Sequence, residues 1–147
     1  MSVNRRSAQR RDGRGTSAGL VPILEPEVSI ESPHKEEAET LLRDALQARI
    51  EGLPDDTTIM LKLTIPTRPG LYAGLAADPR VLRVLALSGG YSRDVACDLL
   101  AKDPAMIASF SRALLEGLTA DQTDEQFTAR LDASIGQIFA ASVTKTG

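Results

Sequence analysis

The residues with the clearest capacity for chemistry lie on two short predicted strands. Side chains alternate along a strand, so Glu25 and Glu27 share one face of the segment 21–28, about 6.6 Å apart along the chain. In the segment 57–65, Lys62 is flanked on both sides by apolar residues, which predicts a lysine in the middle of a buried strand. Burial lowers the pKa of a lysine toward the neutral amine that attacks a carbonyl. This is the requirement for Schiff-base catalysis.

The same pattern has structural explanations. Lys62 could form an internal ion pair with Glu25 or Glu27, or it could face water from an edge strand. The strand pattern alone favours such a structural role, because ion-pair networks also place charged groups inside proteins.

Two further groups of residues follow the next predicted strands and could contact an anion. They are Ser88, Gly89 and Gly90 after the segment 81–87, and Ser109, Ser111 and Arg112 at the end of the segment 106–111. Backbone amides freed by glycine, a helix start and an arginine together suit a phosphate dianion. Because any turn can contain Ser-Gly-Gly, its pairing with Ser-x-Ser-Arg at the next strand end is the stronger signal.

These residues depend on strands that alternate with helices along the chain. The predicted strands cover 21–28, 57–65, 81–87 and 106–111. The predicted helices run from Ser32-Pro33 to Gly52, over 71–77, from the cap Ser92 to Asp103-Pro104, over 112–118, and onward from a capping box of Thr123 and Gln126. We expect the last helix to bury Phe127, Leu131, Ile135 and Ile138.

Four apolar strands separated by helices indicate an α/β fold with a parallel sheet. Two architectures fit this pattern. An open doubly wound sheet would be complete at this length. A (β/α)8 barrel needs about 250 residues, so four units would make about half of one.

The composition excludes several classes of protein and site. The 147 residues carry 17 basic and 20 acidic side chains, for a net charge of −3, so a strongly basic nucleic-acid coat is excluded. With one histidine and one cysteine, the chain cannot assemble a cysteine/histidine zinc site or an internal disulfide, which favours a reducing, cytoplasmic setting. No apolar run reaches the roughly 18 residues of a membrane span.

The first 18 residues differ from the rest in charge. They hold five arginines against Asp12, and we interpret residues 1–18 as a disordered basic leader before a domain over 19–147. The leader lacks aromatic residues and helical periodicity, so we do not expect it to bind nucleic acid.

Four strand-end motifs together resemble a known family. They are 19–28 (GLVPILEPEV), 61–67 (LKLTIPT), 85–92 (LALSGGYS) and 107–118 (IASFSRALLEGL). The residues of these four motifs, and the order of the motifs along the chain, closely resemble the carboxyl-terminal half of class I fructose-bisphosphate aldolase in its shorter bacterial form. The resemblance covers essentially everything from Gly19 to Lys145.

The resemblance implies a TIM (β/α)8 barrel with only strands five to eight present, a half barrel. It implies that Lys62 forms the Schiff base, Glu25 accepts and donates the proton, and Glu27 supports Glu25. The implied contacts of the substrate phosphate are Ser88, Gly89, Gly90, Ser109, Ser111 and Arg112. No metal or cofactor is implied, since the covalent Schiff base on Lys62 takes that place.

The implied activity is the reversible cleavage of fructose 1,6-bisphosphate to dihydroxyacetone phosphate and glyceraldehyde 3-phosphate, in glycolysis and gluconeogenesis. The expected partners are a sugar phosphate and, to complete the barrel, either further copies of the chain or the missing amino-terminal half; neither nucleic acid nor membrane is expected. Two alternatives stay open: an inactive or regulatory fragment that only binds sugar phosphate, and another Schiff-base lyase. Because a half barrel has two unpaired edges, we expect marginal stability or self-association of the chain.

Overall fold

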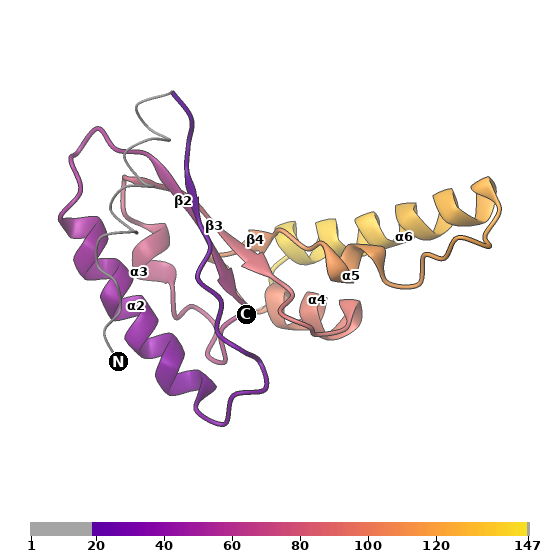
Figure 1. Ribbon diagram of the computed structural model, residues 1–147, viewed down its shortest axis with the longest axis horizontal. Helices are drawn as coiled ribbons and strands as arrows, with labels where there is room; N and C mark the ends of the chain where they lie inside the picture. The colour runs from indigo at the N-terminus through magenta and orange to yellow at the C-terminus, as the bar shows by residue number, and fades with distance from the viewer. Residues whose placement is uncertain (1–18, 147) are drawn as a thin grey trace.

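The computed structural model describes residues 19–146, which form four strands and five helices (Figure 1). In chain order these are β1 (Ile23–Leu24), α2 (Lys35–Glu51), β2 (Ile59–Thr64), α3 (Ala73–Ala76), β3 (Val81–Leu87), α4 (Arg93–Ala101), β4 (Ile107–Ala108), α5 (Arg112–Leu115) and α6 (Asp124–Val143). The expected leader, residues 1–18, lies outside the described residues. No helix within 19–146 is long and apolar enough to cross a membrane.

The four strands form one parallel sheet in the order β1-β2-β3-β4, so the predicted α/β class is confirmed. Every strand pairs with its neighbour in the chain, and the order does not reverse among the described strands. A doubly wound sheet does reverse its strand order at a switch point. Parallel connections of one hand place their helices on one face of the sheet, and α2 and α3 lie together on one side of it in Figure 1.

The core lies between this helix-covered face and the helices. Leu61, Leu63 and Ile65 alternate along β2 and its end, and none is more than 1% exposed. Tyr72 and Leu75 pack against them from the α3 region. The period of a strand places these three side chains on one face of β2, and the structure shows that this face is buried.

The opposite face, which we call the open face, carries Ile23, Met60, Lys62 and Leu85 at paired positions of β1, β2 and β3. None of these four residues is buried, and Ile23 is 50% exposed. The residues expected to do chemistry belong to the open face or follow its strands.

Several element boundaries differ from the prediction. The first strand is shorter than 21–28 because Pro26 has no backbone N–H to donate to a neighbouring strand. The first helix begins at Lys35 and not at Pro33, since Ser32 opens a turn in which its carbonyl accepts the N–H of Lys35 at 3.2 Å. The fourth strand covers only Ile107–Ala108.

Other boundaries are confirmed. The third strand matches 81–87, Gly52 ends α2, and the Ser92 hydroxyl accepts the N–H of Val95 as the cap of α4. Thr123 and Gln126 form the expected capping box of α6.

The expected buried face of α6 is wrong at two positions. Phe127 is 41% and Ile135 is 48% exposed, while Leu131 and Ile138 are half-buried. Only the carboxyl-terminal part of α6 lies near the sheet, and its first turns project away from it in Figure 1. The described residues provide no surface for Phe127, in the first turn, to cover. At Ile135 the buried face is instead offset by one residue, since the neighbouring Ser134 is 0% exposed.

Candidate active site

Lys62 and Glu25 meet on the open face of the sheet. Strand β1 pairs with β2 through Ile23 and Met60, which places Glu25 next to Lys62 just past the end of β1. The Lys62 Nζ lies 2.7 Å from Glu25 Oε1. The Lys62 side chain is 19% exposed and that of Glu25 is 49% exposed. The expected full burial of Lys62 is thus only partial, and the ion pair considered from the sequence is present.

The segment after β1 is held in place by Thr64, the last residue of β2. The Thr64 hydroxyl donates to Val28 O and accepts from Val28 N, both at 2.9 Å. This single side chain continues the attachment of the two segments beyond Pro26, where regular strand pairing ends. Exposed and half-buried residues alternate from Val21 to Ile30, so Glu25 and Glu27 face the same side as expected.

The loop between β3 and α4 requires glycine. Gly89 and Gly90 have φ values of 62° and 110°, a region that residues with a side chain rarely adopt. A Cβ on Gly89 would also lie 3.0 Å from a methyl group of Ile30. Ser88, the first residue of the loop, is buried.

The loop between β4 and α5 brings in the second group of residues. The N–H of Ser109 donates to Ala86 O at 2.8 Å, which extends the β3–β4 pairing to the end of the sheet. Arg112 begins α5, and its Nη2 lies 3.8 Å from Glu27 Oε1. Glu27, which follows β1, and Arg112, which follows β4, therefore form an ion pair across the site.

These residues surround one small hollow of about 100 Å³ at the carboxyl ends of the strands. Its lining consists of Glu25, Glu27, Lys62, Leu87, Ser88, Gly89, Ser109, Ser111 and Arg112. The structure thus brings eight of the nine candidate residues to one place. The ninth, Gly90, lines an adjoining hollow of about 450 Å³ together with Glu27, Gly89 and Arg112.

The arrangement suits amine and anion chemistry. A carboxylate in contact with an amine can pass a proton to and from groups attached to that amine. The serine hydroxyls and the guanidinium can donate hydrogen bonds to an anion. Within residues 19–146 no group of three or more histidine, cysteine, aspartate or glutamate side chains is arranged to hold a metal ion.

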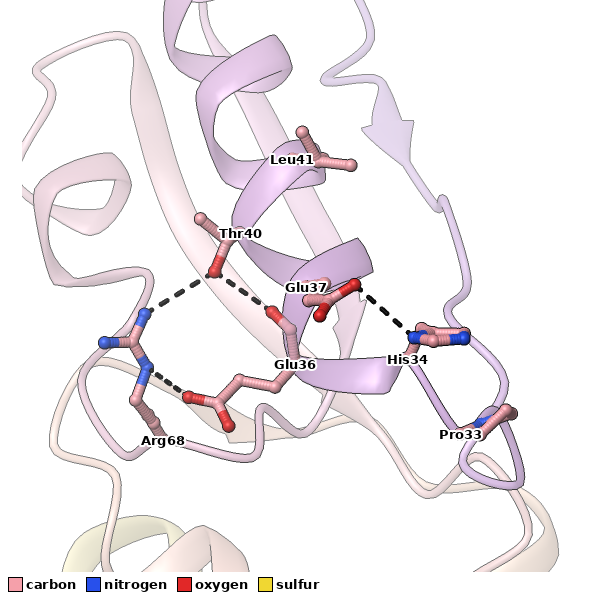
Figure 2. Close-up of a pocket in the computed structure, with 7 residues that line it drawn as sticks. All are labelled: Pro33, His34, Glu36, Glu37, Thr40, Leu41 and Arg68. Carbon is pink, nitrogen blue, oxygen red and sulfur yellow. Dashed lines mark hydrogen bonds and ion pairs between the residues drawn. The ribbon is translucent and has the colours of Figure 1, made fainter.

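A larger hollow of about 670 Å³ lies elsewhere, on the outer side of α2 (Figure 2). Figure 2 shows Arg68 reaching Glu36 and Thr40, and His34 reaching Glu37, with Nδ1–Oε2 at 3.4 Å. The side chains of His34 and Glu37 are about three-quarters exposed, and no candidate residue reaches this surface. His34 is an exposed residue directly before the first turn of α2.

Sequence reasoning missed three residues that support the site. Thr64 lies two positions after Lys62, so the period of the strand already placed it on the same face. Arg93 and Glu116 join the two loops behind the hollow. No local pattern marks that contact, because it joins residues 23 positions apart in the chain.

Comparison with known proteins shows which proteins this chain is similar to. No family model matches the chain. Proteins named fructose-bisphosphate aldolase class 1 do match it, in Clostridium acetobutylicum (50% identical over 126 residues), Synechocystis sp. (51% over 128 residues) and Porphyromonas gingivalis (50% over 127 residues). These matches cover 86 to 87% of this chain but only 43% of each relative.

The chain therefore spans less than half the length of these relatives, as expected for a carboxyl-terminal half. At this identity, over 86 to 87% of the chain, the resemblance inferred from the four strand-end motifs is confirmed, and the chain is related to class 1 fructose-bisphosphate aldolases.

Proposed function

We propose that residues 19–146 are the carboxyl-terminal half of a class I fructose-bisphosphate aldolase barrel, with Lys62 as its Schiff-base lysine. The observation that carries the proposal is the contact of Lys62 with Glu25 in a hollow that both anion-binding loops line. An amine, a proton-carrying carboxylate and a phosphate site are the three parts that the reaction requires of this half.

The proposed reaction begins when the neutral amine of Lys62 attacks the ketone carbon of dihydroxyacetone phosphate or fructose 1,6-bisphosphate. Glu25 gives a proton to the departing hydroxyl of the carbinolamine, so water leaves and a protonated imine forms. In the cleavage direction Glu25, now a carboxylate, accepts the proton of the C4 hydroxyl while the imine accepts the electron pair of the C3–C4 bond. Glyceraldehyde 3-phosphate departs and an enamine remains on Lys62. Return of the proton to C3 restores the imine, and addition of water then releases dihydroxyacetone phosphate and frees Lys62.

Glu27 supports this proton transfer from one side. Its carboxylate lies on the same face as Glu25 and faces Arg112. Ser88, Gly89, Gly90, Ser109, Ser111 and Arg112 bind the phosphate on the dihydroxyacetone side in this proposal. No metal ion takes part, because the imine on Lys62 supplies the electron sink.

The sheet supports the barrel assignment. Four parallel strands in unreversed order leave β1 and β4 as edges, and an eight-stranded barrel closes by pairing such edges. A closed barrel would need four further strands at these edges, from a second copy of this chain or from the amino-terminal half. The exposed apolar residues at both edges, Ile23 on β1 and Ile107 on β4, favour such a covering partner. We place the assembled enzyme in the cytoplasm.

Trapping the imine tests the proposal. The full chain is incubated with dihydroxyacetone phosphate, reduced with borohydride and digested, and the modified lysine is located by mass spectrometry. We expect a reduced adduct on Lys62 that is absent from Lys62→Met and unaffected by Lys102→Met, a lysine remote from the hollow. Absence of the adduct across pH 6 to 9 would refute a working Schiff-base site.

A second candidate function is a fragment that binds sugar phosphate without cleaving it. Its basis is the lining of the hollow by both loops, which could bind a phosphate whether or not cleavage follows. An adduct on Lys62 without release of glyceraldehyde 3-phosphate from fructose 1,6-bisphosphate would support this second function, whereas release would exclude it.

A further inference from the structure

Arg93 connects the start of α4 with α5, the two helices that follow the loops lining the hollow. It is the first residue of α4, three positions after Gly90, and its side chain reaches across to α5. Its Nε donates to Ala113 O at 2.9 Å, and its Nη2 donates to Glu116 O. Because Ala113 directly follows Arg112, the guanidinium holds the backbone next to that candidate phosphate ligand.

Glu116 completes the connection in the opposite direction. Its Oε2 accepts the backbone N–H of Arg93 at 2.7 Å. This N–H is one of the donors at the start of α4 that have no partner within the helix, and a carboxylate is favoured at that position. The Arg93 and Glu116 side chains thus hold the start of α4 and the end of α5 together.

The connection lies behind the hollow and not in it. Arg93 is only 8% exposed, and neither Arg93 nor Glu116 lines the hollow. A buried arginine whose Nε and Nη2 both donate to backbone carbonyl groups has little freedom to move. A change at Arg93 would therefore act on a bound anion through the position of the loops.

We propose that Arg93 and Glu116 are positioning residues that set the spacing between Ser88-Gly89-Gly90 and Ser111-Arg112, so that one phosphate group contacts both loops. This inference rests on the proposed phosphate site. The inference goes beyond the proposed site because it assigns the spacing of the two loops to two residues that touch no substrate. Affinity for phosphate, and not formation of the imine, is the property they control.

Arg80 provides a matched control. It also joins two segments, with Nε 2.9 Å from Asp78 Oδ1 and Nη1 3.1 Å from Leu53 O, but it lies at the amino end of β3. Arg80→Met removes an arginine with comparable contacts at the far end of the strand. It should destabilise the fold without moving either loop.

The test measures binding of inorganic phosphate by calorimetry to the full wild-type chain and to Arg93→Met, Glu116→Gln and Arg80→Met. We expect Arg93→Met to bind phosphate about tenfold more weakly or worse, since small displacements of positioned groups have effects of this size. Glu116→Gln keeps the size of the side chain and loses its charge, so a smaller loss is expected. Arg80→Met is expected to bind like the wild type.

A parallel measurement separates the inference from the proposed function. Borohydride trapping with dihydroxyacetone, which lacks phosphate, is expected to label Lys62 equally in the wild type and in both loop variants. Equal weakening of phosphate binding by Arg93→Met and Arg80→Met, or no phosphate binding by the wild type, would overturn the inference. Phosphate binding that depends on Arg93, without any label on Lys62, would overturn only the Schiff-base function.

Should Arg93→Met fail to fold, as judged by circular dichroism, Glu116→Gln decides. Wild-type phosphate affinity in a folded Glu116→Gln chain would then overturn the inference. Weakened affinity together with unchanged labelling by dihydroxyacetone would support it.

Discussion

Two lysine–glutamate pairs lie on opposite sides of β2, and they differ in burial and in the number of their hydrogen-bond partners. Lys35 and Glu39 meet on the helix-covered side, where their side chains are 10% and 0% exposed. Lys62 and Glu25 meet on the open face, where the corresponding values are 19% and 49%.

The remaining hydrogen bonds separate the two pairs further. Lys35 Nζ also donates to Ile65 O at 2.9 Å and to Thr67 Oγ1 at 3.2 Å, and Glu39 Oε2 accepts the N–H of Thr67 at 2.9 Å. Within residues 19–146, the one recorded partner of Lys62 Nζ is Glu25. A fully satisfied buried pair holds a loop, whereas an amine with a single exposed partner stays available to a ligand.

Removing the carboxylate from each pair is expected to give the largest contrast. Glu39→Gln leaves the Lys35 ammonium buried without its counterion, which costs about 3–5 kcal/mol of unfolding free energy. Glu25→Gln disrupts a partly exposed pair and should cost less than about 1 kcal/mol. Urea denaturation of both variants checks this, and equal losses would show that the two pairs do not differ in the way described.

Truncating an apolar residue on each face extends the comparison to the core. Leu63 is 0% exposed, so Leu63→Ala should lower the unfolding free energy by about 2–5 kcal/mol. Ile23 is 50% exposed, and Ile23→Ala should cost below about 1 kcal/mol in the chain alone. A large effect of Ile23→Ala that grows with protein concentration would show that a second copy covers the open face.

Removing the open-face amine should leave the fold nearly intact. Lys62→Met replaces a partly exposed ion pair by an apolar side chain among apolar neighbours, so the expected change in unfolding free energy is within about 1 kcal/mol. Denaturation followed by circular dichroism measures it. A loss of unfolding free energy several times larger would mean that the main role of Lys62 is to stabilise the fold.

A third ion pair, between Arg80 and Asp78 at the amino end of β3, should show a dependence on pH. Hydrogen bonds from Arg80 lower the pKa of Asp78 from 3.8 to about 2. The stabilisation is therefore fully present above pH 3.8 and disappears as the pH falls toward 2. Asp78→Asn should be less stable than the wild type at pH 7, and the difference should shrink between pH 3.8 and 2 in urea titrations. A difference that is constant with pH would contradict this origin.

The sequence was sufficient to predict much of the fold. Alternation along β2 places Leu61, Leu63 and Ile65 on one face, which is the buried one, and capping residues located the starts of α4 and α6. These features depend on neighbours within a few residues. The ends of β1 and the buried face of α6 were predicted wrongly, since they depend on strand partners and on surfaces that other segments provide.

The residues of the candidate site also fall into those that the sequence predicts and those that depend on distant segments. Parallel strands bring their carboxyl ends together, so the motifs after four predicted strands had to converge, and eight of the nine residues do line one hollow. Their roles in catalysis stay predictions. Thr64, Arg93 and Glu116 support the site through contacts between distant segments, and only coordinates reveal such contacts.

The unreversed strand order has a consequence for how the chain folds. Each strand pairs with the strand just before or after it in sequence, and α2 contacts α3 as α4 contacts α6. Contacts between nearby segments close short loops and favour rapid folding. A strand-helix unit that emerges from the ribosome can therefore dock on the unit made before it, and the sheet can grow in the order of synthesis.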